Sequence, residues 1–320
     1  MKCLCCGKLI NENADIREKE NGWHNKCINS FFGTSNMPII DISEEQLEML
    51  ANDTVSKGLT VPGVQKKLSL HLSNEDDARL TIVNYPTGYI LKPQTEEYDS
   101  LPEFEDLAMR LAQVVGIQTV PHALIKMNGK YAYITKRIDR SIKEEVVSMY
   151  AMEDFCQLSS RLTQDKYKGS YEGCGRIIDK YSVQPGLDMS ELFIRVVFSY
   201  IIGNSDMHLK NFSLIETEPG GRRYCLSEAY DMLPVNLIVP QDEEQLALTL
   251  NGKKRNIRKK DFQVFANTCG IPEKAAEKMM KKLCSLKEKY MEQCEQSYLS
   301  DVLKEKMKEL IVDRINTLSD

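Results

Sequence analysis

Hydrophobic residues follow two different periods along this chain, and the period changes about halfway. In the first part, short apolar runs alternate with polar residues as in β-strands, whereas later the apolar residues recur every three or four positions as in helices. The predicted strands are 67–72, 80–83, 89–93, 122–127 and 131–135, and the predicted helices are 101–115, 190–202, 272–290 and 298–317. This pattern predicts an α+β fold with a β-rich lobe, residues 36–150, and a mostly helical lobe, residues 151–320.

Local signals sharpen this outline. Asn128-Gly129 between two apolar runs predicts a tight β-hairpin, and Gly203 is expected to end the helix that precedes it. The acidic start of 152–157 predicts a helix beginning there. Residues 165–187 are rich in Gly, Tyr and Lys and are predicted to form a loop.

The composition is that of an ordinary globular protein. The chain has 320 residues, 42% of them hydrophobic and 28% charged, and a net charge of −5 that does not favour direct nucleic-acid binding. No apolar run suits a signal peptide or a membrane span, so a cytoplasmic protein without membrane contact is expected. The basic run 253–260 could face phosphate, an acidic partner or RNA, but a solvated basic face is its more common meaning.

Residues 1–35 are predicted to form a separate zinc-knuckle unit. Cys3 and Cys6 form a CxxC pair, and His24 and Cys27 form an HxxC pair further along. Two such pairs supply the four ligands that tetrahedral structural zinc requires, and Cys5 is a possible rival for one of these positions. The alternative is two clusters of reduced thiols. Four protein ligands leave no open position, so catalytic zinc is not expected.

A dense polar segment, 203–213, follows an apolar helix and is the strongest catalytic candidate. Asp206 and Asn211 are five positions apart, as in the kinase catalytic loop, where the Asp accepts a hydroxyl proton and the Asn holds a metal ion. His208 and Lys210 are expected to orient this loop or to contact phosphate. The alternative interpretation is a turn with solvated charges.

A predicted hairpin returns a second acid to this loop. Its turn centres near Gly220, so the numbers of facing residues should sum to roughly 440 if no bulge intervenes. This register brings Asp231 close to Asn211, and the two oxygen donors suit Mg²⁺. Alternatively, Asp231 caps a turn.

A lysine and a glutamate in the β-rich part form a second candidate group. Lys92 ends the strand 89–93, and Glu105 lies in the first turns of the helix that follows. In kinases a strand lysine paired with a helix glutamate orients the α- and β-phosphates of ATP. Each residue taken singly is more often a solvated charge.

Two further segments could contact a nucleotide. The backbone amides of the glycine-bearing segment 58–67, with Val64, Gln65 and Lys66, could cradle phosphates, although an ordinary turn is equally compatible. The segment 136–140, with Lys136, Arg137, Ile138 and Asp139, lies where a β-lobe would pass into a helical lobe, so its backbone could contact adenine.

These motifs together resemble the HipA-like protein kinases, the toxin kinases of bacterial type II toxin–antitoxin systems. The resemblance extends from residue 58 to about 310 and preserves the family's order of motifs. It is carried by the following segments: 60–67, 89–93, Glu105, 136–140, 153–157, 203–213 and 229–233.

The resemblance implies a two-lobed protein-kinase-like fold and a serine/threonine protein kinase that uses ATP and Mg²⁺. It makes Asp206 the base, Asn211 and Asp231 the metal ligands, and Lys92 the phosphate lysine. Lys136 to Ile138 would form the hinge. Thr60 falls where members autophosphorylate in the loop before Gly63, which would make the chain a phosphoprotein.

The resemblance also implies partners. Members act with a DNA-binding antitoxin, and some phosphorylate aminoacyl-tRNA synthetases. Longer members carry an N-terminal β domain that has no counterpart here, as in short members where a separate small protein replaces it. Two alternatives from other classes remain: an inactive nucleotide-binding or partner-docking module, and a small-molecule kinase.

Overall fold

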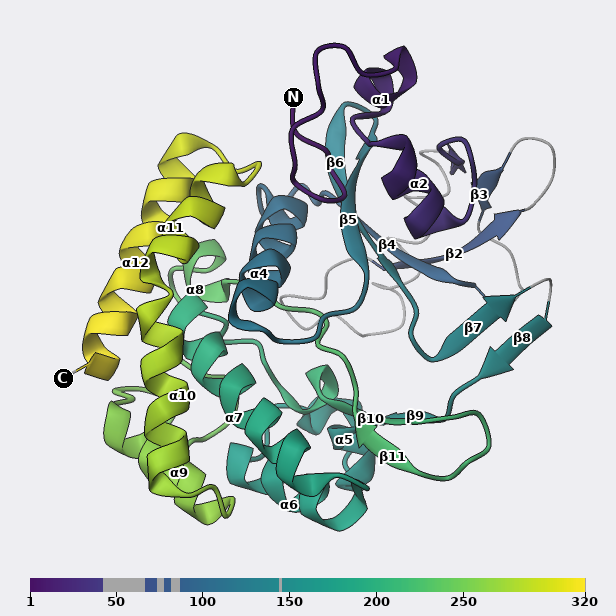
Figure 1. The fold of residues 1–320 in the computed structure, drawn as a ribbon. Helices are drawn as coiled ribbons and strands as arrows, with labels where there is room; N and C mark the ends of the chain where they lie inside the picture. Colours follow the sequence, from purple (N-terminus) through teal and green to yellow (C-terminus); the bar gives the residue numbers. More distant parts are fainter. Residues whose placement is uncertain (43–66, 74–77, 82–86, 144–145, 320) are drawn as a thin grey trace. The chain divides into compact units, whose positions relative to one another are not determined.

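The computed structural model describes residues 1–42, 67–73, 78–81, 87–143 and 146–319. Within them the chain divides into two compact units, residues 1–106 with 121–147 and residues 107–120 with 148–320. The first unit is β-rich and the second mainly helical, so the predicted α+β class is confirmed (Figure 1). None of the helices in these ranges is both long and apolar enough to cross a membrane.

The first unit is built on a six-stranded sheet in the order β1-β3-β2-β4-β6-β5. All neighbouring strands are antiparallel except β1 and β3. The elements are α1 (Ile16–Asn21), α2 (Asn25–Phe32), β1 (Ile39–Asp41), β2 (Leu68–Ser73), β3 (Arg79–Thr81), β4 (Tyr89–Pro93), β5 (His122–Met127), β6 (Lys130–Lys136) and β7 (Arg140–Lys143), which pairs with β8 (Val146–Met149). Helix α4 (Leu101–Val115) runs from the first unit into the second.

The hairpin predicted at Asn128-Gly129 is present. β5 and β6 pair from His122–Thr135 to Met127–Lys130. Asn128 and Gly129 have φ of 51° and 76°, the left-handed values that a two-residue turn of this kind requires. The strand and helix predictions in this unit are therefore confirmed for 89–93, 101–115, 122–127 and 131–135.

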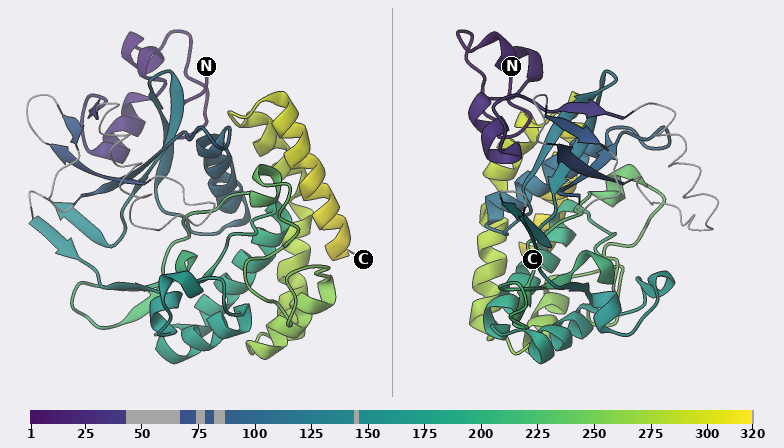
Figure 2. Two further views of the ribbon diagram at one scale, coloured as in Figure 1. Left: turned by 180° about the vertical axis from the view of Figure 1, so that it is seen from behind. Right: turned by 90° about the vertical axis from the view of Figure 1, so that its right-hand side faces the viewer.

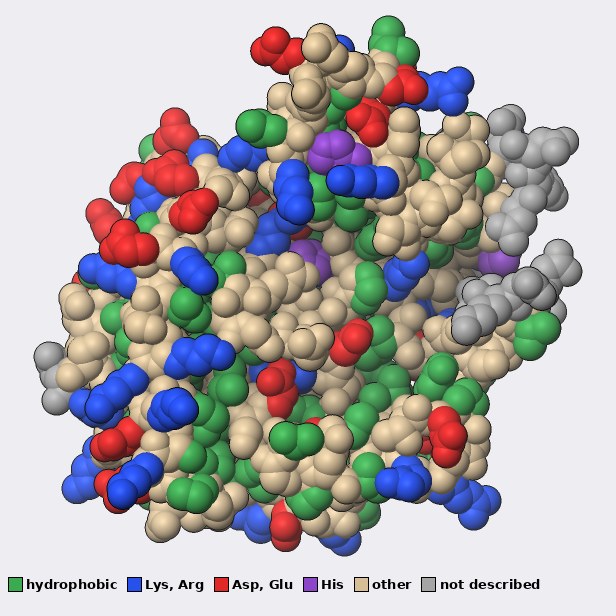
Figure 3. All heavy atoms as spheres, viewed as in Figure 1, with side chains coloured by type: hydrophobic (Ala, Val, Ile, Leu, Met, Phe, Trp, Pro, Cys, Tyr) green, Lys and Arg blue, Asp and Glu red, His purple; other side chains and the backbone are tan. Residues whose placement is uncertain are grey.

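The second unit surrounds the apolar helix α7, whose residues from Leu192 to Ile202 are almost all buried. Its elements are β9 (Met152–Asp154), α5 (Phe155–Leu158), η1 (Thr163–Asp165), α6 (Tyr171–Tyr181), α7 (Pro185–Ile202), η2 (Leu209–Asn211), β10 (Ser213–Glu216), β11 (Tyr224–Leu226), α8 (Val235–Ile238), α9 (Lys259–Thr268), α10 (Glu273–Ser285), α11 (Lys287–Gln296) and α12 (Asp301–Ser319). Helices α10, α11 and α12 lie side by side in every view (Figure 2). Acidic and basic side chains intermingle over them, as on a solvated face (Figure 3).

Three local predictions in this unit are wrong. The helix predicted over 272–290 is divided at Leu286 into α10 and α11. The segment 165–187 is not a continuous loop, because it contains α6 and the start of α7. Residues 152–154 do not open a helix but form β9, which pairs with β10 and places Ser213 opposite Asp154. The helix begins at Phe155, where the Asp154 carboxylate accepts the N–H of Gln157.

The hairpin that follows the polar loop has the predicted register. Leu214 faces Leu226, Ile215 faces Cys225 and Glu216 faces Tyr224. Beyond the paired strands, the N–H of Ser227 donates to the carbonyl of Ser213 at 2.9 Å. The chain after β11 therefore runs back along the start of β10 toward residue 211.

Gly203 ends α7 with φ of 70° and donates its N–H to the carbonyls of Ser199 and Tyr200. A Cβ at this position would lie 2.6 Å from Leu310 Cδ2. We expect Gly203→Ala to lower the free energy of unfolding by about 1–3 kcal/mol, because a side chain adds both backbone strain and a steric clash. Denaturant unfolding measures this change.

Gly186, in the first turn of the same helix, is the matched control. A Cβ there meets no atom within 4 Å, so Gly186→Ala should leave stability unchanged or slightly raised. Equal effects of the two substitutions would contradict the assigned role of Gly203.

Candidate functional site: a polar loop, a buried ion pair and a Cys/His cluster

A buried asparagine holds the polar loop to the end of α7. The N–H of Asn204 donates to the carbonyl of Ser199 at 2.8 Å, and its side-chain Oδ1 accepts the N–H of Asp206 at 3.2 Å. Asn204 has no exposed surface. Because α7 is buried and ends at a fixed glycine, the position of Asp206 is set by the core rather than by solvent.

Asn211 closes the loop from its other end. Its side-chain Nδ2 donates to the carbonyl of Asp206 at 2.9 Å, and its N–H donates to the carbonyl of His208. Asn211 is buried, whereas the Asp206 side chain keeps 33% of its surface exposed. Because Nδ2 makes this bond, Oδ1 is the side-chain atom of Asn211 that could act as an oxygen ligand of a metal ion.

The contacts of Tyr230 locate its neighbour Asp231. The Tyr230 hydroxyl lies 2.6 Å from Ser213 Oγ and 3.1 Å from the carbonyl of Lys210, so its neighbour Asp231 returns to the Asn211 end of the loop. Asp231 has φ of 59°, a backbone conformation that costs a non-glycine residue about 1 kcal/mol. Strained positions of this kind cluster at functional sites.

Tyr167 is a site residue that the sequence did not reveal. Its hydroxyl donates to Asp206 Oδ1 at 2.5 Å, and its ring packs edge-on against the ring of His208. Burial and the nearby Asp206 carboxylate raise the pKa of Tyr167, so the phenol stays protonated and acts as a donor. No sequence signal marks this residue, because it lies 39 positions from Asp206 in a segment predicted to be a loop.

Lys210 and His208 both make contacts within this unit. Lys210 Nζ donates to Asp154 Oδ2 at 2.6 Å, and His208 Nε2 lies 3.9 Å from Asp206 Oδ1. Of the two roles considered for Lys210, orientation of the loop therefore agrees better with the structure than phosphate contact. Cations of the 253–260 run are likewise paired with acids: Lys253 with Asp261, Lys254 with Glu244 and Arg255 with Glu243.

In the first unit, Lys92 Nζ donates to Glu105 Oε1 at 2.5 Å. Both side chains are almost fully buried, and Lys92 Nζ lies 5.4 Å from the centre of the Tyr133 ring. Removing two charges from water costs several kcal/mol for each ion, so a buried pair is weak evidence for a role in stability. The pair joins β4 to the start of α4, which is the arrangement that the sequence predicts.

The predicted hinge segment is held by its own charges. The Asp139 carboxylate accepts bidentate hydrogen bonds from both Arg137 and Arg140. Burial opposes ionisation of Asp139, but these two guanidiniums lower its pKa to about 2. Lys136 Nζ lies over the Phe31 ring at 5.5 Å, so this side chain belongs to the packing of α2. Thr60, Val64, Gln65 and Lys66 lie outside the described residues.

The four predicted zinc ligands lie together. Cys3, Cys6, His24 and Cys27 place their ligand atoms within 4.8 Å of one another. His24 Nδ1 is 3.4 Å from Cys6 Sγ and 3.8 Å from Cys27 Sγ, close to the spacing of about 3.6 Å that a tetrahedral zinc ion imposes between a nitrogen and a sulfur ligand. The other ring nitrogen, Nε2, is 3.2 Å from the carbonyl of Leu9, which fixes the ring as a metal-bound histidine requires.

The cluster is continuous with the sheet. Trp23, fully buried, packs on Phe31 and Phe32 and donates its Nε1–H to the carbonyl of Leu124 in β5. Tyr89, on the same strand as Lys92, donates its hydroxyl to the carbonyl of Phe31. The Cys/His cluster therefore supports an aromatic layer on β4 and β5.

The fold and these polar groups define a protein of the protein-kinase-like class. Residues 59–290 match the family model of the HipA-like C-terminal domain, and the chain belongs to that family. It is 31% identical over 232 residues to the putative kinase Y4dM of Sinorhizobium fredii, which covers 67% of this chain and 54% of that protein. It is 26% identical over 235 residues to the serine/threonine-protein kinase toxin HipA of Shewanella oneidensis, covering 67% and 52%. The chain thus spans about half the length of these relatives.

A solved structure shows the same fold. The complex of HipA, HipB and operator DNA from Shewanella oneidensis matches with a TM-score of 0.69 and 19% sequence identity. The match covers 80% of this chain and 64% of that one. At this identity the likeness bears on the fold, and together with the family match it confirms the predicted HipA-like kinase fold.

We expect protein purified without added metal to contain about one zinc ion per chain. Cys27→Ser should lose this zinc and lower the melting temperature, because the cluster supports a buried aromatic layer. Trp23 is the single tryptophan of the chain, so its fluorescence should shift to the red in this variant. Metal analysis and fluorescence check the two effects.

Cys5→Ser is the matched control, because Cys5 is absent from the four-residue cluster. It should keep both the zinc and the fluorescence of the wild type. A metal-free wild type with an unshifted spectrum would refute the zinc site.

Proposed function

We propose that this chain is an ATP- and Mg²⁺-dependent serine/threonine protein kinase. The observation that carries the proposal is the Asp206 carboxylate, which is held by the core, partly exposed, and already bonded to a hydroxyl donor at 2.5 Å. A general base must accept a hydrogen bond from the substrate hydroxyl, and the bond from Tyr167 shows that Asp206 can accept one from a hydroxyl group. The family match and the relatives named as kinases support the same reaction class.

Asp206 would receive the proton of the substrate hydroxyl as the phosphoryl group is transferred. Asn204 and Asn211 fix the loop backbone on either side of it, through the N–H and the carbonyl of Asp206. Tyr167 binds Oδ1 and orients the carboxylate toward the substrate hydroxyl. Most of the rate would come from this positioning and from electrostatic stabilisation.

Asn211 Oδ1 and the Asp231 carboxylate would hold Mg²⁺, and their oxygen chemistry suits this hard cation. When bound, the ion would neutralise charge on the phosphates of ATP. Lys92, oriented by Glu105, would bind phosphate oxygens, and the segment 136–139 would contact adenine through its backbone. Val64, Gln65 and Lys66 would cradle phosphates, and Thr60 would be the site of autophosphorylation.

The proposal extends to toxin–antitoxin partners. The Shewanella oneidensis relative is named a kinase toxin, and its solved complex contains HipB and operator DNA. By this likeness the chain would act with an antitoxin-type DNA-binding partner. A protein substrate, of which an aminoacyl-tRNA synthetase is one candidate, would carry the phosphorylated hydroxyl.

Asp206→Asn should reduce phosphate transfer from ATP by about 10²- to 10⁴-fold, because the amide cannot accept the hydroxyl proton. The same substitution should leave the melting temperature unchanged, since the side chain is partly exposed. Intact-mass measurement after incubation with ATP and Mg²⁺ detects the added phosphate.

Asp313→Asn, an exposed change on α12, is the control and should behave as the wild type. Full transfer by Asp206→Asn would end the proposal. ATP binding without transfer by the wild type would favour a binding module, and transfer restricted to small molecules would favour a small-molecule kinase.

Tyr167→Phe should lower kcat about ten-fold while leaving KM for ATP unchanged, because a hydrogen bond to a carboxylate is worth about 1.5–3 kcal/mol. Steady-state kinetics separates the two constants. Tyr224→Phe, which removes a hydroxyl elsewhere in the same unit, should change neither. An unchanged kcat in Tyr167→Phe would show that this hydroxyl does not orient Asp206.

A further inference from the structure

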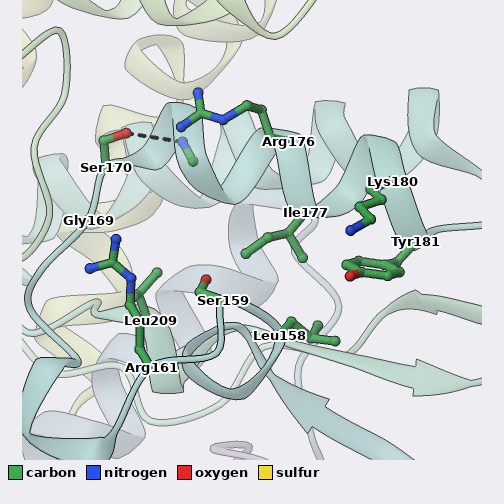
Figure 4. A pocket seen from close by; sticks show the side chains of 11 residues that line it. Leu158, Ser159, Arg161, Gly169, Ser170, Arg176, Ile177, Lys180, Tyr181 and Leu209 are labelled. Carbon is green, nitrogen blue, oxygen red and sulfur yellow. Dashed lines mark hydrogen bonds between the residues drawn. The ribbon is translucent and has the colours of Figure 1, made fainter.

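A pocket of about 410 Å³ opens in the second unit beside the polar loop. Its walls come from the end of α5, the segment leading into α6, one side of α6, and η2 (Figure 4). The lining residues are Leu158, Ser159, Arg161, Gly169, Ser170, Gly173, Arg176, Ile177, Lys180, Tyr181 and Leu209. None of the roles proposed above uses this pocket.

Positive charge dominates its rim. Arg161, Arg176 and Lys180 line the pocket, and no acidic residue does. Within the described part of the chain, the guanidiniums of Arg161 and Arg176 form no ion pair with a carboxylate. This differs from Lys210, Lys253 and Arg255, which are each paired. Arginines at a pocket that form no ion pair can bind carboxylates through bidentate hydrogen bonds.

Three aliphatic side chains also line the pocket: Leu158, Ile177 and Leu209, of which Ile177 and Leu209 are largely buried in the unit. The hydroxyls of Ser159 and Ser170 also line the pocket, and Ser170 Oγ accepts the N–H of Gly173. Aliphatic side chains beside basic ones fit a peptide that places an aliphatic side chain between acidic ones.

The pocket lies next to the proposed base along the chain. Leu209 is three residues after Asp206, so their Cα atoms are at most about 11 Å apart. Beside Leu209, Gly169 is two residues after Tyr167, which binds Asp206, and the N–H of Leu209 donates to the carbonyl of Lys166. An extended peptide in the pocket would reach Asp206 within about four residues.

We propose that this pocket docks an acidic segment of the protein whose hydroxyl is phosphorylated. The inference rests on the proposed kinase function and adds a recognition rule to it: carboxylates flanking an aliphatic residue, about four positions from the acceptor hydroxyl. Nucleic acid fits less well, because Tyr181 is the single aromatic residue of the lining and stacking platforms for bases need several.

Two fluorescein-labelled peptides test the proposal. Both carry a serine and, about four residues away, the sequence Glu-Leu-Glu in one and Gln-Leu-Gln in the other. Fluorescence anisotropy with the full chain, without ATP, should give about ten-fold tighter binding of the acidic peptide, weakening with added salt. Arg161→Ala combined with Arg176→Ala should abolish this preference.

Lys278→Ala combined with Lys281→Ala, two exposed positions on α10, is the charge-matched control and should keep the preference. Equal binding of the two peptides, or a preference that survives in the arginine double variant, would overturn the proposal. The proposal would also fail if a phosphoserine peptide bound while the Glu-Leu-Glu and Gln-Leu-Gln peptides bound equally. It would fail too if a short oligouridine displaced the acidic peptide at a lower concentration than the unlabelled acidic peptide does.

The binding arm involves no phosphate transfer, so its result is independent of the kinase proposal. Phosphorylation of the two peptides with ATP and Mg²⁺ is then measured separately. Acid-selective binding without phosphate transfer would support the docking proposal and contradict the kinase proposal. Phosphate transfer without acid-selective binding would support the kinase proposal and contradict the docking proposal.

Discussion

The hydrogen bonds of Asn204 are the constraint on which the polar loop depends. The backbone N–H of this buried residue binds the last turns of α7, its side chain accepts the N–H of Asp206, and an unsatisfied amide at that depth would cost about 1–3 kcal/mol. The helix itself is fixed by its apolar surface and by Arg195, a buried cation that reaches Glu191 and the carbonyl of Ser227. A loop anchored in this way cannot relax without disturbing the core, which is the condition for presenting a carboxylate with a defined orientation.

In the first unit, the charged candidate residues are held by a buried ion pair. Lys92 and Glu105 are buried together between strand and helix, with the Tyr133 ring beside the ammonium. Hydrophobic replacements of such a pair are often neutral or stabilising, so its presence is better explained by function than by stability. The aromatic layer of Trp23, Phe31 and Phe32 lies on the same sheet and contacts Tyr89, three residues before Lys92. The Cys/His cluster is thereby linked to the strand that carries the lysine.

What could be predicted from the sequence had a local signature. The Asn128-Gly129 turn, the register of the 214–226 hairpin and the two ligand pairs of the cluster are all set by residues close together in the chain. Helix α6 had no such signature, because Gly173 and Gly175 lower its helix propensity. Tertiary packing explains the glycine in this helix: a Cβ at Gly175 would lie 2.6 Å from Cys269 Sγ, so glycine allows α6 to pack closely there. Tyr167 was missed because its function arises from a contact between distant segments.

Lys210 and Asp206 are charged residues of the same loop with different partners. Asp154 binds Lys210 with one oxygen and caps α5 with the other, so a single carboxylate fixes both the loop and the helix beside it. Lys210 is thus paired with a carboxylate of the same unit. About a third of the side chain is exposed in both Lys210 and Asp206. The difference between the two residues lies in their partners, a carboxylate for Lys210 and a phenol hydroxyl for Asp206. A proton-accepting group must be held still and yet be reached, and the Tyr167 hydroxyl and the fixed loop backbone hold Asp206 in this way.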